Sequence, residues 1–102
     1  MSYVINHLHE IVSALNRAGL ETTNEGFGRN AMASTPYTQY TIYLAQRHLD
    51  EDRNYIADVI AAACPQFVVD GFLDASYQIA HGRFAAELWC FVHLKSDDKN
   101  YE

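Results

Sequence analysis

Apolar residues recur at three- and four-residue steps in two segments of the chain, and this spacing predicts two amphipathic helices. The first segment ends at Gly19, a residue that can close a helix in a left-handed conformation. Its apolar positions are Val4, Ile5, Leu8, Ile11, Val12 and Leu15. The second begins at the acidic residues 50–52, whose charge offsets the helix dipole, and ends before Pro65. Its apolar positions are Leu49, Ile56, Val59, Ile60 and Ala63.

The stretch between these helices predicts two strands separated by a loop. Residues 37–47 alternate in polarity, as a half-buried strand does, with Tyr40, Ile42 and Leu44 on one face and Gln39, Thr41 and Tyr43 on the other. A short edge strand is expected near residues 20–27, where threonines favour extended backbone. Gly and Asn residues interrupt the segment 21–36 heavily, so its remainder is expected to be a mobile loop that ends at Pro36.

The last third of the chain predicts a long β-hairpin. Residues 66–80 and 83–95 both alternate, and His81-Gly82 between them suits a two-residue turn. With Ala80 opposite Arg83, this turn sets the pairing along the whole hairpin. The pairs on the helix-facing side are then Ile79 with Phe84, Tyr77 with Ala86, Ala75 with Leu88, Leu73 with Cys90 and Val69 with Leu94. The pairs on the other side are Phe72 with Phe91, Asp74 with Trp89 and Asp70 with His93.

Together these elements predict an α+β fold, in which two helices pack on one face of a four-stranded, mainly antiparallel sheet. The element order is helix, strand, strand, helix, strand, strand. The predicted domain spans residues 1–95, and residues 96–102 are expected to form a polar C-terminal tail.

Composition narrows the class of protein. A chain of 102 residues with 49 % hydrophobic and 20 % charged residues is typical of one globular domain. The start does not resemble a signal peptide and no apolar run is long enough to cross a bilayer, so a cytoplasmic location without membrane contact is expected. Seven basic and thirteen acidic residues give a net charge of −6. Without a basic stripe, direct nucleic-acid binding is not expected, whereas an acidic surface can meet a basic protein partner.

Residue types that carry catalysis or bind metals form no recognisable constellation in the sequence. The histidines lack metal-ligand spacing, since two of them diverge on a helix and the others are scattered. They are His7, His9, His48, His81 and His93. The serines lack a nucleophile-elbow motif. Cys64 and Cys90 lie in apolar sequence, which predicts buried, unreactive thiols. No catalytic residue, metal site or cofactor is therefore predicted.

The hairpin register leaves one face of the sheet without a helix to cover it. Aromatic and acidic residues gather there, which is unusual for a monomer and typical of interfaces. We expect this face to bind a partner through Tyr43, Phe72, Asp74, Glu87, Trp89 and Phe91. The partner is either a second copy of the chain or another molecule. Two alternatives stay open: the 21–36 loop covers part of this face, or the two faces are assigned the wrong way round.

These expectations favour a non-enzymatic, acidic protein-interaction module that forms a homodimer. In its most specific form, the protein is an inhibitor that occupies a basic groove on a nucleic-acid-handling complex, as small phage-encoded antagonists often do. The alternative is a small ligand-binding domain or enzyme with its site between the 21–36 loop and the sheet. The candidate residues for that site are Arg29, Tyr37, Tyr40 and His48.

Overall fold

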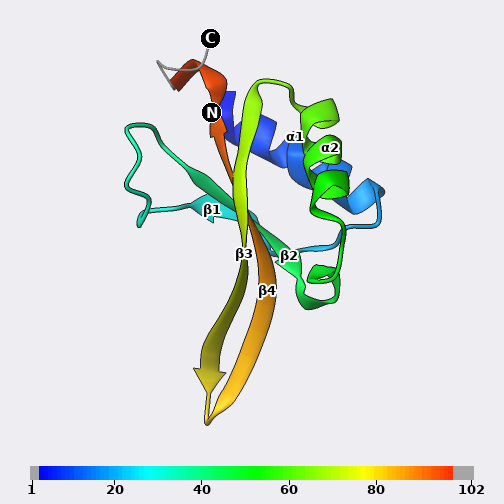
Figure 1. The fold of residues 1–102 in the computed structure, drawn as a ribbon, viewed down its shortest axis with the longest axis vertical. Coiled ribbons are helices and arrows are strands. Elements are labelled where there is room, and N and C mark those ends of the chain that lie inside the picture. The colour runs from blue at the N-terminus through cyan, green and yellow to red at the C-terminus, as the bar shows by residue number, and fades with distance from the viewer. Residues whose placement is uncertain (1–2, 98–102) are drawn as a thin grey trace.

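The predicted order of helices and strands is confirmed by a computed structural model of the chain, which describes residues 3–97 (Figure 1). The elements are α1 (Tyr3–Arg17), β1 (Thr22–Arg29), β2 (Tyr40–Ala45), α2 (Arg53–Ala63), β3 (Phe67–Ala80) and β4 (Arg83–Leu94), with short 3-10 helices η1 (Gln46–His48) and η2 (Lys95–Asp97). The first two residues of the predicted domain and residues 98–102 of the predicted tail lie outside the described residues. No helix within residues 3–97 is long and apolar enough to cross a membrane.

The four strands form one antiparallel sheet in the order β1-β2-β4-β3. Both helices pack side by side on the same face of this sheet, as the α+β prediction requires (Figure 1). We call this face the helix-covered face and the opposite one the open face. The core lies between helices and sheet; its fully buried residues include Leu8, Ile11, Leu15, Ile42, Leu44, Ile56, Ile60, Leu88, Cys90 and Val92.

The two helices have caps that match signals in the sequence. After α1, Gly19 has a φ of 84°, and the backbone N–H of Leu20 donates a hydrogen bond to the carbonyl of Leu15 at 2.9 Å. This is the hydrogen bonding of a Schellman cap, and it leaves Leu20 buried beside the last turn. At the start of α2, the side chain of Asp52 accepts a hydrogen bond from the backbone N–H of Asn54 at 2.9 Å.

The predicted pairing of the hairpin is wrong beyond its turn. Ala80 does lie opposite Arg83, but the register shifts by one residue at Ile79, and Leu73 consequently pairs with Trp89. Such an extra residue in one strand is a β-bulge, and it reverses the face to which the following side chains point. β4 keeps its predicted faces, whereas the middle of β3 is turned over.

Phe72 and Asp74 therefore lie on the helix-covered face, contrary to the prediction. Nη2 of Arg53 in α2 lies 2.8 Å from Oδ1 of Asp74, and the guanidinium carbon lies 5.6 Å from the centre of the Phe72 ring. Leu73, which was expected in the core, is on the open face and is 49 % exposed. A second register shift, at Asp70, turns the start of β3 back toward the helices.

β1 is an edge strand, as predicted, and it contains a wide bulge. Residues 23–26 together lie opposite one residue of β2, Tyr43. The last three of them have positive φ angles: 50° at Asn24, 66° at Glu25 and 96° at Gly26. A Cβ atom on Gly26 would lie 2.6 Å from the side chain of Val12, so a larger residue could not bring the bulge this close to α1.

The far half of the β3–β4 hairpin projects beyond the rest of the sheet (Figure 1). β2 pairs with β4 only as far as Glu87, so beyond that point the hairpin is a two-stranded ribbon. Every residue from 76 to 84 is exposed, and we call this segment the arm. Its turn, His81-Gly82, has positive φ at both residues, as a type I′ turn requires. Three large apolar side chains are exposed on it: Tyr77, Ile79 and Phe84.

Candidate functional site

Large apolar side chains from three neighbouring strands form a row across the open face. Trp89 of β4 lies opposite both Tyr43 of β2 and Leu73 of β3. The rings of Tyr43 and Trp89 have their centres 5.6 Å apart and their planes at 73°, an edge-to-face contact. None of these three side chains is fully buried. The predicted faces of β2 and β4 are therefore confirmed, and Tyr43 and Trp89 lie together on the open face.

A buried carboxylate lies next to this row. Glu87, expected to be a partner-binding residue, is only 5 % exposed. Its Oε1 accepts a hydrogen bond from Nε1 of Trp89 at 2.9 Å. Its Oε2 accepts from Oγ1 of Thr23 at 2.6 Å and from Nδ2 of Asn24 at 2.7 Å. Within residues 3–97 no basic side chain forms an ion pair with Glu87, so three neutral donors replace the water around this acid.

These side chains help to form a groove on the open face, which we call the aromatic groove. It lies between the bulge of β1 and the root of the arm and has a volume of about 570 Å³. Its lining residues are Asn24, Glu25, Phe27, Tyr43, Tyr77, Glu87 and Trp89. Gly28 makes room for one wall, because a Cβ atom there would lie 2.6 Å from the hydroxyl of Tyr43. The lining contains two carboxylates and no Lys or Arg.

The other end of the open face is covered. The ring of Tyr37, in the connection between β1 and β2, stacks on His93 of β4 with 3.9 Å between ring centres. Nδ1 of His93 lies 2.8 Å from Oδ1 of Asp70, and Nε2 of Gln39 donates to Asp70 at 2.9 Å. The residues that cover this end, Tyr37 and Gln39, follow the 21–36 loop that the alternative named and belong to the segment predicted as a strand.

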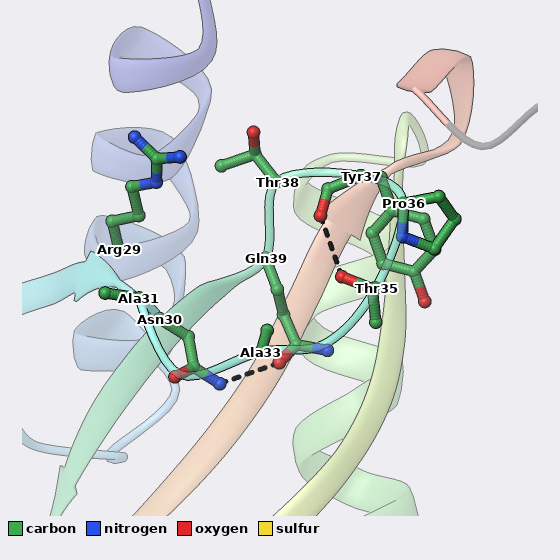
Figure 2. Close-up of a pocket in the computed structure, with 9 residues that line it drawn as sticks. All are labelled: Arg29, Asn30, Ala31, Ala33, Thr35, Pro36, Tyr37, Thr38 and Gln39. Carbon is green, nitrogen blue, oxygen red and sulfur yellow. Dashed lines mark hydrogen bonds between the residues drawn. The ribbon is translucent and has the colours of Figure 1, made fainter.

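The connection between β1 and β2 encloses a smaller pocket of about 270 Å³ (Figure 2). Two of the four residues predicted for a small-ligand site, Arg29 and Tyr37, line this pocket. Tyr40 packs against the core instead. His48 is buried beyond the far end of β2, where its Nε2 accepts a hydrogen bond from the backbone N–H of Glu21 at 2.9 Å. The four residues therefore do not converge on one site.

Polar groups of this smaller pocket bond to one another (Figure 2). Nδ2 of Asn30 donates to Oε1 of Gln39 at 2.8 Å, and Oγ1 of Thr35 donates to the carbonyl of Tyr37 at 2.7 Å. Figure 2 shows the side chain of Arg29 directed away from the first of these hydrogen bonds. The hydrogen bonds thus hold the conformation of the connection itself.

Both cysteines are buried, as predicted. Burial raises the pKa of the Cys90 thiol to about 12, with a smaller contribution from the negative charge of Asp70. Burial also raises the pKa of the Cys64 thiol, against a hydrogen bond from the backbone of Gln66 that lowers it. Neither sulfur is activated as a thiolate nucleophile at neutral pH.

Within residues 3–97 no three His, Cys, Asp or Glu side chains are placed to hold a metal ion.

Sequence reasoning missed several residues of this surface. Leu73 and Tyr77 reach the open face because of the bulge at Ile79, and Thr23 and Asn24 reach Glu87 because of the bulge in β1. Glycines were the available signals, because a glycine inside a strand pattern often marks a bulge. Gly26 lies in the β1 bulge and Gly71 directly follows the second shift in β3.

No protein-family model matches the chain, and no curated protein or solved structure is significantly similar to it. The surfaces described above are therefore the basis for a functional proposal.

Proposed function

We propose that this protein is a non-enzymatic protein-binding module that contacts its partner through the open face and the arm. The arm is the observation that carries the proposal. Tyr77, Ile79 and Phe84 are 36 %, 55 % and 67 % exposed on a two-stranded ribbon. Large apolar side chains that gather on an exposed surface are typical of interaction sites, where a few of them supply most of the binding free energy.

Apolar side chains lie on both faces of the arm. Tyr77 shares the open face with Leu73, so a single surface runs from the aromatic groove along the arm. Phe84 lies on the opposite face, in a part of the hairpin that neither helix covers (Figure 1). A ribbon that is apolar on both faces buries more area inside a cleft than on a flat surface, and we therefore propose that the arm inserts into its partner.

In the more specific form of the proposal, the partner presents a basic cleft. The net charge of −6 supports this, as do the exposed carboxylates of Asp50 and Asp52 before α2. Complementary charge speeds association and selects among partners. The protein would then act as an inhibitor of a nucleic-acid-handling complex, because its acidic surface and arm occupy a cleft that otherwise binds phosphates.

A homodimer is a further form of the same proposal. The outer edge of β3 has no neighbouring strand within residues 3–97, and the edge strands of two copies can pair. Phe72 has no role in this version because it faces the helices, whereas Trp89 and Phe91 remain available on the open face. Light scattering at micromolar concentration is decisive. A dimer that Trp89→Asp converts to a monomer supports self-association through the open face, a dimer that the substitution leaves intact supports pairing through the edge of β3, and a monomeric wild type excludes both.

Affinity capture from native host lysate tests the general proposal. The baits are the wild type, the arm variant Tyr77→Ser/Ile79→Ser/Phe84→Ser, and the control Tyr55→Ser, which removes an exposed tyrosine from α2. We expect the wild type and the control to retain the same protein after nuclease treatment, and the arm variant to lose it. Equal recovery by all three baits would contradict the proposal. Circular dichroism verifies that each bait is folded.

The second candidate function is binding or conversion of a small ligand in the pocket between β1 and β2. The observation that favours it is the cationic side chain of Arg29 on the rim of a largely polar pocket, which suits a small anion. Mass spectrometry of the purified protein under native conditions tests this candidate. A bound small molecule that is lost in Arg29→Ala supports it, and a wild type without bound mass that resists thermal stabilisation by inorganic phosphate counts against it.

A further inference from the structure

We propose that the aromatic groove holds the guanidinium group of an arginine side chain that the protein partner presents. This inference rests on the proposed function, because the arginine belongs to the partner that the open face and the arm bind. The inference names one binding site on that surface and the type of side chain that occupies it.

Three aromatic rings line the groove, and contacts hold two of them, Trp89 and Tyr43, in place. The indole of Trp89 is held by its hydrogen bond to Glu87, at 2.9 Å. The ring of Tyr43 contacts the indole edge to face and extends over Gly28, where a Cβ atom would collide with its hydroxyl. Tyr77 adds a third ring from β3. Rings that are already held in place lose little conformational entropy on binding, and a cation over their faces gains cation–π attraction.

The charges in the groove favour a cation. Glu25 and Glu87 are its charged lining residues, and both are acidic. Glu87 is nearly buried, so solvent screens its negative charge only weakly. Its oxygens already accept three hydrogen bonds, and Glu25 is therefore the carboxylate placed to meet the incoming cation. Glu25 is exposed and forms no ion pair with another residue of the described part of the chain.

Arginine fits this site better than lysine. The guanidinium group is planar, so it can stack on an indole or phenol ring while its N–H groups reach a carboxylate. It is also more weakly hydrated than an ammonium group and loses less on leaving water. Neutral and anionic side chains lack both the cation–π attraction to the rings and the charge attraction to Glu25.

The single tryptophan of the chain gives a direct readout, because Trp89 lines the groove. The experiment follows its indole N–H resonance by NMR while N-acetyl-arginine amide is added to the full chain. N-acetyl-citrulline amide is the matched control, with nearly the same shape and no charge. We expect a saturable shift with the arginine probe in the millimolar range, as for a single side chain, and none with citrulline. Equal shifts with both probes, or no saturable shift with arginine, would overturn the inference.

Two variants test the walls and the charge separately. Tyr77→Leu keeps an apolar side chain but removes a ring face, and we expect it to weaken arginine binding roughly 2- to 30-fold, the range that measured cation–π energies imply. Glu25→Gln should weaken binding and reduce its dependence on salt. Tyr55→Leu on α2 is the matched control and should bind like the wild type. Wild-type affinity in both groove variants would contradict the assignment of the site.

Failure of this inference is distinguishable from failure of the proposed function. If the arm captures a partner but the indole resonance does not shift with arginine, the proposed function stands and the groove assignment is wrong. If the indole resonance shifts with arginine but the wild type and the arm variant capture the same proteins, the proposed function is wrong.

Discussion

Nε1 of Trp89 donates a hydrogen bond of 2.9 Å to Oε1 of Glu87, two residues earlier on the same strand and the same face of the sheet. The other oxygen of this carboxylate accepts hydrogen bonds from Thr23 and Asn24, in the bulge of an edge strand more than sixty residues away in sequence. One buried acid therefore fixes both an aromatic wall of the groove and the backbone of β1 opposite it.

Glu87→Gln should destabilise the protein by about 1–3 kcal/mol, because an amide has one acceptor oxygen and leaves at least one of the three donors unpaired. At ~4–8 °C per kcal/mol for a chain of this size, the melting temperature should fall by several degrees. Amide exchange within residues 23–26 should rise more than elsewhere. Unchanged melting and exchange would show that this carboxylate does not hold the bulge.

Leu8→Ala and Ile60→Ala should each cost about 2–5 kcal/mol of stability, because both side chains are fully buried at the helix–sheet interface. We expect the melting temperature to fall by about 10 °C or more. Ser13→Ala, on the exposed side of α1, should change it very little. Calorimetry measures all three variants. If Ser13→Ala lowered the melting temperature as much as Leu8→Ala, α1 would be buried on both sides.

Cys90 should make the stability of the protein depend on pH in the alkaline range. Its pKa is about 12 in the folded chain, against an ordinary value of 9.0, so the unfolded chain releases this proton first. The contribution of the protonated Cys90 thiol to the free energy of unfolding is fully present below pH 9. It is lost as the pH rises toward 12, at about 1.4 kcal/mol per pH unit. Urea unfolding across this range should show a steeper loss for the wild type than for Cys90→Ala. Parallel curves would contradict the burial of this thiol.

Tyr37→Ala should release the connection between β1 and β2 from the open face. The stack of Tyr37 on His93 is worth about 0.5–1.5 kcal/mol, so global stability should change little. Amide exchange of residues 31–38 should accelerate locally. Tyr3→Ala, which removes an exposed tyrosine at the start of α1, is the control and should leave that exchange unchanged. If the control has the same effect as Tyr37→Ala, the stack does not anchor this connection.

Elements with a strong period could be predicted from the sequence. The apolar stripes of α1 and α2, the alternation of β2, and the cap at Gly19 all reflect local physical preferences, and the structure has each of them. The buried faces of β2 and β4 were also predicted correctly, because Ile42 and Leu44 of β2 and Leu88 and Cys90 of β4 recur at every second position and all lie in the core.

Bulges could not be predicted from alternation. The alternation of β3 places Leu73, Tyr77 and Ile79 on its apolar side, and the one-residue shift at Ile79 turns Leu73 and Tyr77 of that side to the open face. Glu87 is a similar case: an acid in an apolar strand indicates an exposed position, unless donors from a distant segment are known. Those donors come from a bulge in β1, which long-range packing against Val12 shapes.

Site-specific photo-crosslinking tests the binding surface most directly. Benzoylphenylalanine replaces Tyr77 of the arm in one protein and Tyr55 of α2 in another, and both are illuminated in native host cells. Both side chains are exposed, at 42 % for Tyr55 and 36 % for Tyr77, and replacement of Tyr55 also removes the hydrogen bond that its hydroxyl donates to the carbonyl of Ala18. We predict a discrete protein adduct from position 77 and none from position 55. An adduct from position 55 alone, or none from position 77, would contradict the claim that the arm and the open face bind the partner.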